Sequence, residues 1–182
     1  MKNRPQHFFQ RSAWLANPAG SRGYRHWLLD RGSLTQRLRA KSAAFGVEGV
    51  HQKWARPQPD EACLLGLPPR QHALLREVRL CCNQQMVVFA HSVLPRRSLR
   101  GAWHGLERLG ARPLGEALFN NPAVVRTSMR YRKLSAANPL FRRALAGMAN
   151  APSHLWARRS VFMLRGASIL VTEVFLPGVL TL

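Results

Sequence analysis

Acidic side chains are scarce in this 182-residue chain, which has eight Asp and Glu against 28 Lys and Arg and a formal net charge of +20. A field of this sign attracts anions, whether nucleic acid, phospholipid or a small polycarboxylate. The basic residues are spread along the chain without forming a tail, as is typical of a solvated surface. The sequence has no RNA-binding signature and no regular alternation of aromatic and basic residues, so no specific nucleic-acid partner is predicted.

Disulfide and metal chemistry have little basis in the sequence. The three cysteines, Cys63, Cys81 and Cys82, are an odd number, and adjacent cysteines on a strand point to opposite faces. The seven histidines are scattered, with no H-x-H or H-E-x-x-H spacing. We therefore predict reduced cysteines and no metal site.

Long apolar runs are also missing. None reaches the ~18 residues of a membrane helix, and the basic start "MKNRPQHFFQRSAWLANPAG" lacks the apolar region of a secretion signal. The hydrophobic content of 46% is ordinary for a globular protein, and a chain of this length suits one domain. The sequence thus predicts a single-domain protein of the cytoplasm, without a transmembrane segment.

Hydrophobic periodicity predicts six strands and several helices in residues 24–182, after a loose basic tail in residues 1–23. The predicted strands cover residues 45–55, 73–82, 86–94, 124–134, 158–166 and 168–176. The predicted helices cover residues 24–32, 33–42, 98–110, 112–120 and 138–148. The stretch 56–70 contains four prolines and is predicted to be a long loop. Some of the predicted strands follow each other through short turns, and the predicted helices come in pairs between strands. This order indicates an α+β domain with a six-stranded antiparallel sheet.

Local signals refine three of these elements. Ser33 and Gln36 have the spacing of a capping box, which predicts a helix that begins near Leu34. Pro113 is expected in the first turn of its helix, where proline is tolerated. The stretch "VVRTSMRYRKL" alternates cleanly, so we expect one strand with Arg126 on its solvent-exposed face.

Two charged residues fall on apolar faces of the predicted strands. Arg76 and Glu173 each have apolar residues two positions away on the same side of the strand, so both should point inward. An inward charge is costly unless it is paired or hydrogen-bonded. One explanation is a buried ion pair of Arg76 and Glu173 with each other or with Arg158 or Arg159. The other is a closed pocket for a small ligand with a carboxylate and a hydroxyl, since guanidinium binds both carboxylate oxygens at once.

Five motifs, in order from about Trp27 to Pro177, carry a family resemblance. They are "LLREVRLC" around Arg76, "FAHSVLP" at 89–95, "LERLGARPLGEALF" at 106–119, "LWARRSVF" at 155–162 and "ILVTEVFLP" at 169–177. Together they resemble the chorismate pyruvate-lyase family of bacterial ubiquinone biosynthesis.

The resemblance implies a monomeric α+β fold in which two helical flaps bury the ligand. It implies that chorismate is cleaved to 4-hydroxybenzoate and pyruvate, without a metal or organic cofactor. Arg76 would bind the ring carboxylate, and Glu173 would face the ring hydroxyl, either as a base or only to orient the ring. Leu34 and Leu114 would contact the ligand through their backbones.

The chain departs from the family pattern at several places. His91 and Leu34 stand where the family commonly has arginine and methionine, and a neutral imidazole at 91 would weaken attraction for a second carboxylate. Residues 135–152 are expected to form a surface insertion that could meet an acidic partner or a membrane. Two other functions stay open: a non-catalytic domain of this fold that binds an aromatic acid, and a basic nucleic-acid-binding protein.

Overall fold

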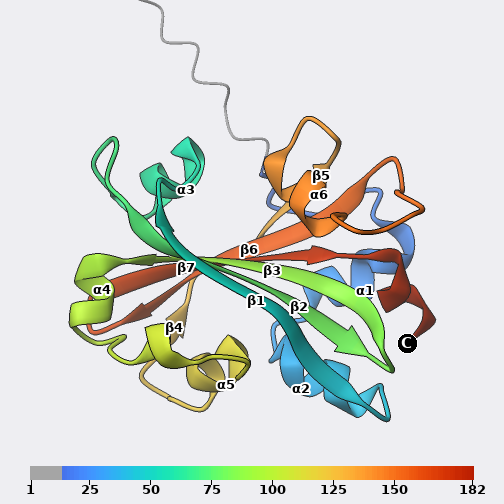
Figure 1. The fold of residues 1–182 in the computed structure, drawn as a ribbon, viewed down its shortest axis with the longest axis horizontal. Helices are drawn as coiled ribbons and strands as arrows, with labels where there is room; N and C mark the ends of the chain where they lie inside the picture. The colour runs from blue at the N-terminus through green and yellow to red at the C-terminus, as the bar shows by residue number, and fades with distance from the viewer. Residues whose placement is uncertain (1–13) are drawn as a thin grey trace, which may run out of the picture.

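The computed structural model describes residues 14–182 and contains one antiparallel sheet of seven strands (Figure 1). The strand order is β1-β2-β3-β7-β6-β4, and β5 also pairs with β6. The strands are β1 (Phe45–Ala55), β2 (Ala73–Cys82), β3 (Gln85–Pro95), β4 (Val125–Arg126), β5 (Arg130–Leu134), β6 (Leu155–Leu164) and β7 (Ala167–Phe175). The predicted α+β class with an antiparallel sheet is confirmed.

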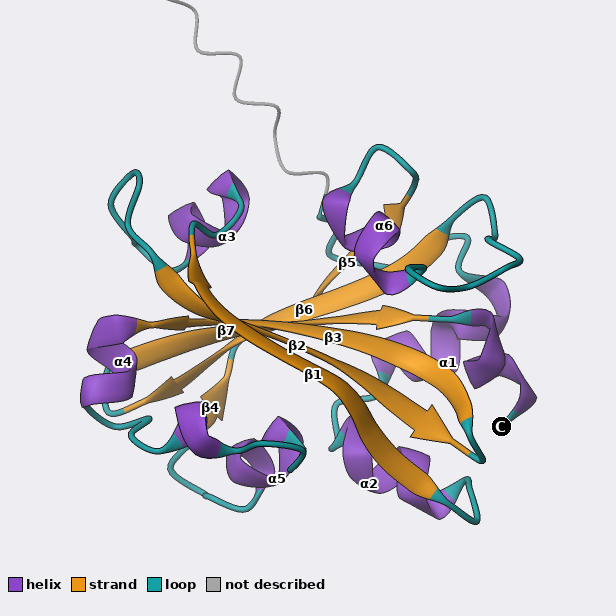
Figure 2. Cartoon of the chain, viewed as in Figure 1, coloured by secondary structure: helices purple, strands orange, loops and turns teal. Residues whose placement is uncertain are grey.

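The helices are short and lie outside the sheet (Figure 2). The α-helices are α1 (Arg25–Leu29), α2 (Leu34–Ala40), α3 (Pro59–Leu64), α4 (Arg96–Arg100), α5 (Leu114–Phe119) and α6 (Pro139–Ala144). The 3-10 turns are η1 (Arg22–Tyr24), η2 (Leu106–Arg108) and η3 (Pro177–Thr181). Ser33 caps α2 as predicted, with its side chain accepting from the Gln36 N–H, whereas Pro113 is the N-cap of α5 and not part of its first turn.

The predicted strands 73–82 and 86–94 form one β-hairpin, and the predicted strands 158–166 and 168–176 form another. Strands β2 and β3 pair through a turn at Asn83 and Gln84, whose φ angles of 50° and 65° suit a tight hairpin turn. Strands β6 and β7 pair around Gly166, which has a φ of 77° that a residue without Cβ adopts readily. These hairpins pair with each other along β3 and β7, so the centre of the sheet contains the motifs "FAHSVLP" and "ILVTEVFLP".

The fourth predicted strand is wrong in one respect, because it is two strands. Both β4 and β5 pair with β6, but residues 127–129 between them are not in a strand. Thr127 marks the break: its side-chain hydroxyl, in place of a carbonyl, accepts the Val161 N–H at 3.1 Å. The alternation restarts after it, so that Val125 is 60% exposed while Tyr131 is buried.

The predicted loop 56–70 contains helix α3, so the prediction of a loop from its four prolines is wrong for this part of the stretch. Pro59 is the first residue of this helix, where its missing N–H costs nothing. The Glu61 carboxylate accepts the N–H of Gln58 at 2.9 Å and so closes the first turn.

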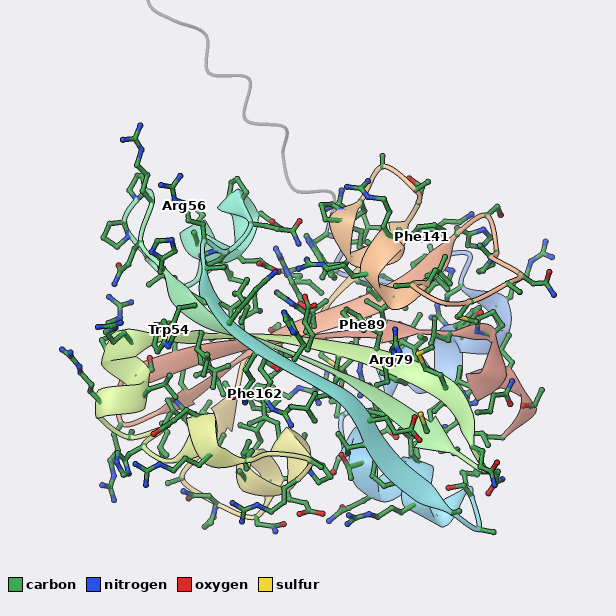
Figure 3. All side chains as sticks on the ribbon, in the orientation of Figure 1. Trp54, Arg56, Arg79, Phe89, Phe141 and Phe162 are labelled. Carbon is green, nitrogen blue, oxygen red and sulfur yellow. The ribbon has the colours of Figure 1, made fainter. Side chains whose placement is uncertain are left out.

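The segment 135–152 is not a surface insertion. Its helix α6 buries Leu140 and Phe141 in an apolar cluster with Phe89 of β3. Figure 3 shows Phe89 and Phe141 on the side of the sheet that α6 covers. Helix α6 is therefore part of the core of the domain, while residues 149–151 of the segment are exposed.

The predicted tail, residues 1–23, lies partly outside the described residues. Leu15 pairs with Tyr131 through two backbone hydrogen bonds of 2.7 and 2.9 Å. The Trp14 indole donates to Asp60 at 3.1 Å. Trp14 and Leu15 thus contact the domain that was predicted to begin at Tyr24.

The sheet has two covered faces. We call the side that carries Arg76 and Glu173 the pocket face and the other side, which carries Glu77 and His91, the back face. Helices α2 and α5 lie over the pocket face, and α3 and α6 over the back face (Figure 1). On the pocket face one apolar cluster gathers around α1 and α2 and another around η2 and α5, and the strip of sheet between them holds the polar residues described next.

Candidate active site

A cavity lies between the pocket face and helices α2 and α5. These two helices, which we call the flaps, touch each other along a seam. A Cβ on Gly115 of α5 would lie 2.9 Å from the Thr35 hydroxyl of α2, so only glycine allows this approach. Arg39 and Glu116 form an ion pair of 2.6 Å across the same seam. The flaps therefore close over the cavity as one cover.

All four residues predicted for the site line this cavity. Arg76 comes from β2, Glu173 from β7, and Leu34 and Leu114 are the first residues of α2 and α5. Backbone N–H groups in the first turn of a helix have no acceptor within the helix. The main chain at Leu34 and Leu114 is thus suited to contact a polar ligand.

Arg76 is buried and has no carboxylate partner among the described residues. Its side chain is 2% exposed, and its Nη2 donates to the carbonyls of Gly110 and Arg112 at 3.1 and 3.0 Å. Its Nε is buried without any hydrogen-bond partner in residues 14–182. Burial lowers the pKa of this guanidinium. The two carbonyls fix its orientation and leave an N–H that a ligand could accept from.

Glu173 pairs with Arg158 and not with Arg76. The Arg158 Nε donates to Oε2 of Glu173 at 2.5 Å. Arg158 also donates through Nη1 to the carbonyls of Trp27 and Asp30, at 2.8 and 2.6 Å. The buried ion pair considered from the sequence is therefore real for Glu173, yet Glu173 also lines the cavity. Its Oε1 has no hydrogen-bond partner within the described part of the chain, so it can accept a hydrogen bond from a ligand.

The spacing of the two charged groups suits a ring with substituents at opposite ends. Ser92 of β3 is the register partner of Arg76, and Ala90, two residues earlier, is the partner of Glu173. Arg76 and Glu173 are thus two interstrand spacings apart, about 10 Å across the sheet. The rest of the lining is mostly apolar and includes the ring of Phe162, which Figure 3 shows on the α5 side of the sheet.

Sequence reasoning missed two polar residues near the cavity. Ser92 lines it and is buried, and the regular register of the β2–β3 hairpin was the signal that could have placed it opposite Arg76. Arg126, predicted to face solvent, is half-buried and donates from Nε to the Ser160 hydroxyl at 3.0 Å. No signal in the alternating stretch could have shown this, because the strand breaks directly after Arg126.

His91 lies on the back face, not in the cavity, and the expectation of a neutral imidazole that weakens ligand attraction is wrong. Its Nδ1 lies 2.9 Å from Glu77 and its Nε2 lies 3.2 Å from Glu61. Burial, the largest single influence, lowers the pKa of His91, but the two carboxylates together raise it above its ordinary value. Arg143 of α6 completes this buried cluster through an ion pair of 2.6 Å with Glu77.

Two further properties of residues 14–182 bear on the chemistry. No three His, Cys, Asp or Glu side chains in this range come together in a way that could hold a metal ion. No helix in the same range is long and apolar enough to cross a membrane.

The fold is shared with solved structures. The chain is similar to the effector domain of PhnF from Mycobacterium smegmatis, with a TM-score of 0.56, 16% sequence identity, and coverage of 82% of this chain and 91% of that one. At this identity the likeness shows a shared α+β fold and nothing more.

Comparison with sequence families is more specific. A family model described as "Chorismate lyase" matches residues 8–181. The chain is 48% identical to a probable chorismate pyruvate-lyase of Methylobacillus flagellatus, over 94% of this chain and 97% of that one. It is 52% identical to a protein with the same name from Thiobacillus denitrificans, over 92% of this chain and 90% of that one. The chain belongs to the chorismate lyase family, and the resemblance seen in its motifs is confirmed.

Proposed function

We propose that this protein is a chorismate pyruvate-lyase, which breaks a carbon–oxygen bond of chorismate to release 4-hydroxybenzoate and pyruvate. Family membership supports this, as do the names of the relatives. The observation that carries the proposal is the buried guanidinium of Arg76, which has no carboxylate partner among the described residues and lies about 10 Å across the sheet from Glu173 in the cavity beneath the flaps. An unpaired buried cation is costly, and an anionic ligand removes that cost.

Arg76 binds the ring carboxylate. Its Nε–H has no partner among the described residues and donates a hydrogen bond to the ring carboxylate, while the charge of the guanidinium attracts the same anion. The Nη2 on the same edge of the guanidinium donates to the Gly110 and Arg112 carbonyls, which fix the orientation of the group, so that little conformational entropy is lost when the ligand binds.

Glu173 holds the ring hydroxyl. Arg158 occupies Oε2 of this carboxylate, and Oε1 accepts the hydrogen bond from the hydroxyl of the substrate. The carbon that bears this hydroxyl loses its proton, and the enolpyruvyl oxygen leaves from the adjacent ring carbon. The ring becomes aromatic, while the departing enolpyruvate takes up a proton to give pyruvate. Aromatisation drives the reaction, so the protein contributes mainly orientation and charge placement.

The flaps keep water from the reacting ring. Leu34 and Leu114 begin the two flap helices and line the cavity, so their backbones contact the ligand in the closed state. A cavity covered in this way must open before the product leaves, and we expect 4-hydroxybenzoate to inhibit by slow release.

The test is to incubate the purified full chain with chorismate and to measure 4-hydroxybenzoate by chromatography and pyruvate by a coupled assay. Equal amounts of both, formed well above a protein-free control, are expected. Folded protein that yields neither would contradict the proposal. Binding of 4-hydroxybenzoate without turnover would instead favour the non-catalytic aromatic-acid-binding domain.

We also propose, from the family resemblance, that the protein works as a monomer in the cytoplasm and that its product supplies ubiquinone biosynthesis. Light scattering measures the oligomeric state directly, and one chain per particle is expected. A strain that lacks the gene should lose ubiquinone and regain it when 4-hydroxybenzoate is supplied.

A further inference from the structure

Two arginines on the pocket face lack a carboxylate partner among the described residues. One is Arg76, and the other is Arg126 of β4. The other arginines that contact this region are paired: Arg158 with Glu173, and Arg37 with Asp30. A guanidinium removed from water without a counter-ion is costly, so each unpaired arginine indicates a place for an anion.

Arg126 does not itself line the cavity but lies beside two rings that do, and two hydrogen bonds hold it there. Its Nε donates to the Ser160 hydroxyl at 3.0 Å, and its Nη1 donates to the Arg31 carbonyl at 3.1 Å. Its guanidinium carbon lies 5.7 and 5.2 Å from the ring centres of Phe119 and Phe162, which both line the cavity. A guanidinium has five N–H donors, so Arg126 keeps donors without a partner in the described structure.

The two unpaired arginines lie on opposite sides of Glu173. Arg76 is on β2 and Arg126 on β4, and Glu173 is on β7 between them in the strand order. Arg126 is close enough to Glu173 for the two charges to interact: burial lowers the pKa of Arg126, and the Glu173 carboxylate acts in the opposite direction. Arg76 lies at the end of the cavity that would hold the ring carboxylate of the substrate. Arg126 is a second cation, beside Glu173, at the end that would hold the ring hydroxyl.

Chorismate has one carboxylate more than 4-hydroxybenzoate. The additional carboxylate is on the enolpyruvyl group, whose ether oxygen is attached to the ring carbon next to the one that bears the hydroxyl. With the ring carboxylate at Arg76 and the hydroxyl at Glu173, the enolpyruvyl group leaves the ring beside Glu173. We propose that Arg126 binds the enolpyruvyl carboxylate, and this inference rests on the proposed lyase function.

This role would divide recognition between the two arginines. Arg76 binds a group that substrate and product share, whereas Arg126 binds a group that only the substrate has and that leaves as pyruvate. Arg126 therefore contributes to the binding of chorismate and pyruvate but not to that of 4-hydroxybenzoate. A merely structural role, in which Arg126 ties the Arg31 loop and the flaps to β6, would affect all three ligands together.

The test compares Arg126→Gln with wild type in three measurements: KM for chorismate, and inhibition constants for 4-hydroxybenzoate and for pyruvate. We expect the KM for chorismate and the inhibition constant for pyruvate to rise about tenfold or more, because the hydrogen-bonded ion pair between Arg126 and the ligand carboxylate is lost. The 4-hydroxybenzoate constant should stay within about twofold. Arg130→Gln, an exposed change on β5, is the control and should alter none of them.

Three results would overturn the inference. Equal weakening for chorismate and 4-hydroxybenzoate would make Arg126 a structural clamp, and no change in either would make it irrelevant to binding. Wild-type protein without lyase activity would remove the proposed function and the inference with it. If Arg126→Gln does not fold, Arg126→Lys, which keeps the charge without the planar fork, should still raise KM for chorismate more than the 4-hydroxybenzoate constant.

Discussion

Arg158 and Glu173 are register partners on β6 and β7, and Arg158 Nε lies 2.5 Å from Glu173 Oε2. The same arginine donates to the carbonyls of Trp27 and Asp30 in the segment that leads into flap helix α2. One guanidinium thus connects the floor of the cavity to one of its flaps. The stability of the fold and the orientation of Glu173 should therefore depend on the same side chain.

Replacing Arg158 by methionine should be severely destabilising. It leaves the Glu173 carboxylate without its counter-ion, and breaking a buried pair in this way costs about 3–5 kcal/mol. Urea unfolding measures the loss. Arg130→Met, exposed on β5, is the matched control and should change stability by less than about 0.5 kcal/mol. A loss no larger than that of the control would mean that the pair contributes nothing.

Glu173→Gln should still fold, although with lower stability because Arg158 loses its counter-ion, and should reduce kcat by about 100-fold or more, since the amide cannot replace a carboxylate at the ring hydroxyl. Steady-state kinetics with chorismate and circular dichroism of the same preparation measure the two effects. A variant with full turnover and higher stability would show that Glu173 serves only the ion pair with Arg158.

Arg76→Lys should weaken 4-hydroxybenzoate binding about tenfold or more, because an ammonium cannot donate to the Gly110 and Arg112 carbonyls and also supply the N–H that Arg76 Nε directs to the ligand carboxylate. Calorimetric titration measures the affinity directly. The exposed Arg100→Lys of α4 is the matched control. Unchanged affinity in Arg76→Lys would make Arg76 a structural residue that only holds the Gly110 and Arg112 carbonyls.

Gly115→Ala should force the two flaps apart. Its Cβ would meet the Thr35 hydroxyl at 2.9 Å, so we expect a loss of about 1–3 kcal/mol in stability and weaker 4-hydroxybenzoate binding. Gly46→Ala is the control, because a Cβ there has no neighbour within 4 Å. Adding Thr35→Ala should restore part of the loss. If Gly115→Ala behaves like Gly46→Ala, the flaps do not meet at this seam.

Stability should fall as the pH rises above about 6.5, the ordinary pKa of histidine. The raised pKa of His91 means that its charged form is favoured in the folded protein, so its contribution is complete below that pH and is lost as the pH rises through the folded value. Burial raises the pKa of Glu77, but His91 and Arg143 lower it more, so Glu77 stays ionised throughout. Urea unfolding from pH 6 to 9 should show a smaller decline in His91→Gln, and an equal decline would contradict this account.

Strand alternation was sufficient to predict that Arg76 and Glu173 each point inward, because both lie in long hairpins, and the register of β2, β3 and β7 then places them on one face. It could not choose between Arg158 and Arg159 as the partner of Glu173, since that choice depends on the register of β6 against β7. It failed at Arg126, where the Thr127 hydroxyl replaces a main-chain acceptor and the period-2 pattern restarts.

The back face was harder to predict than the pocket face. The prolines around α3 favour a loop, and only the contact between Gln58 and Glu61 shows that Pro59 begins a helix. The surroundings of His91 depend on Glu61 of that helix and on Arg143 of α6, which are distant in sequence. A pairing formed by packed helices has no local signature, so the raised pKa of His91 could not be predicted.

The most direct test of the account is a crystal structure of the protein with 4-hydroxybenzoate. We expect the ring in the cavity beneath α2 and α5, its carboxylate within about 3 Å of Arg76 Nε and its hydroxyl at the same distance from Glu173 Oε1. A ligand bound outside this cavity, or bound with its hydroxyl at Arg76, would contradict the account.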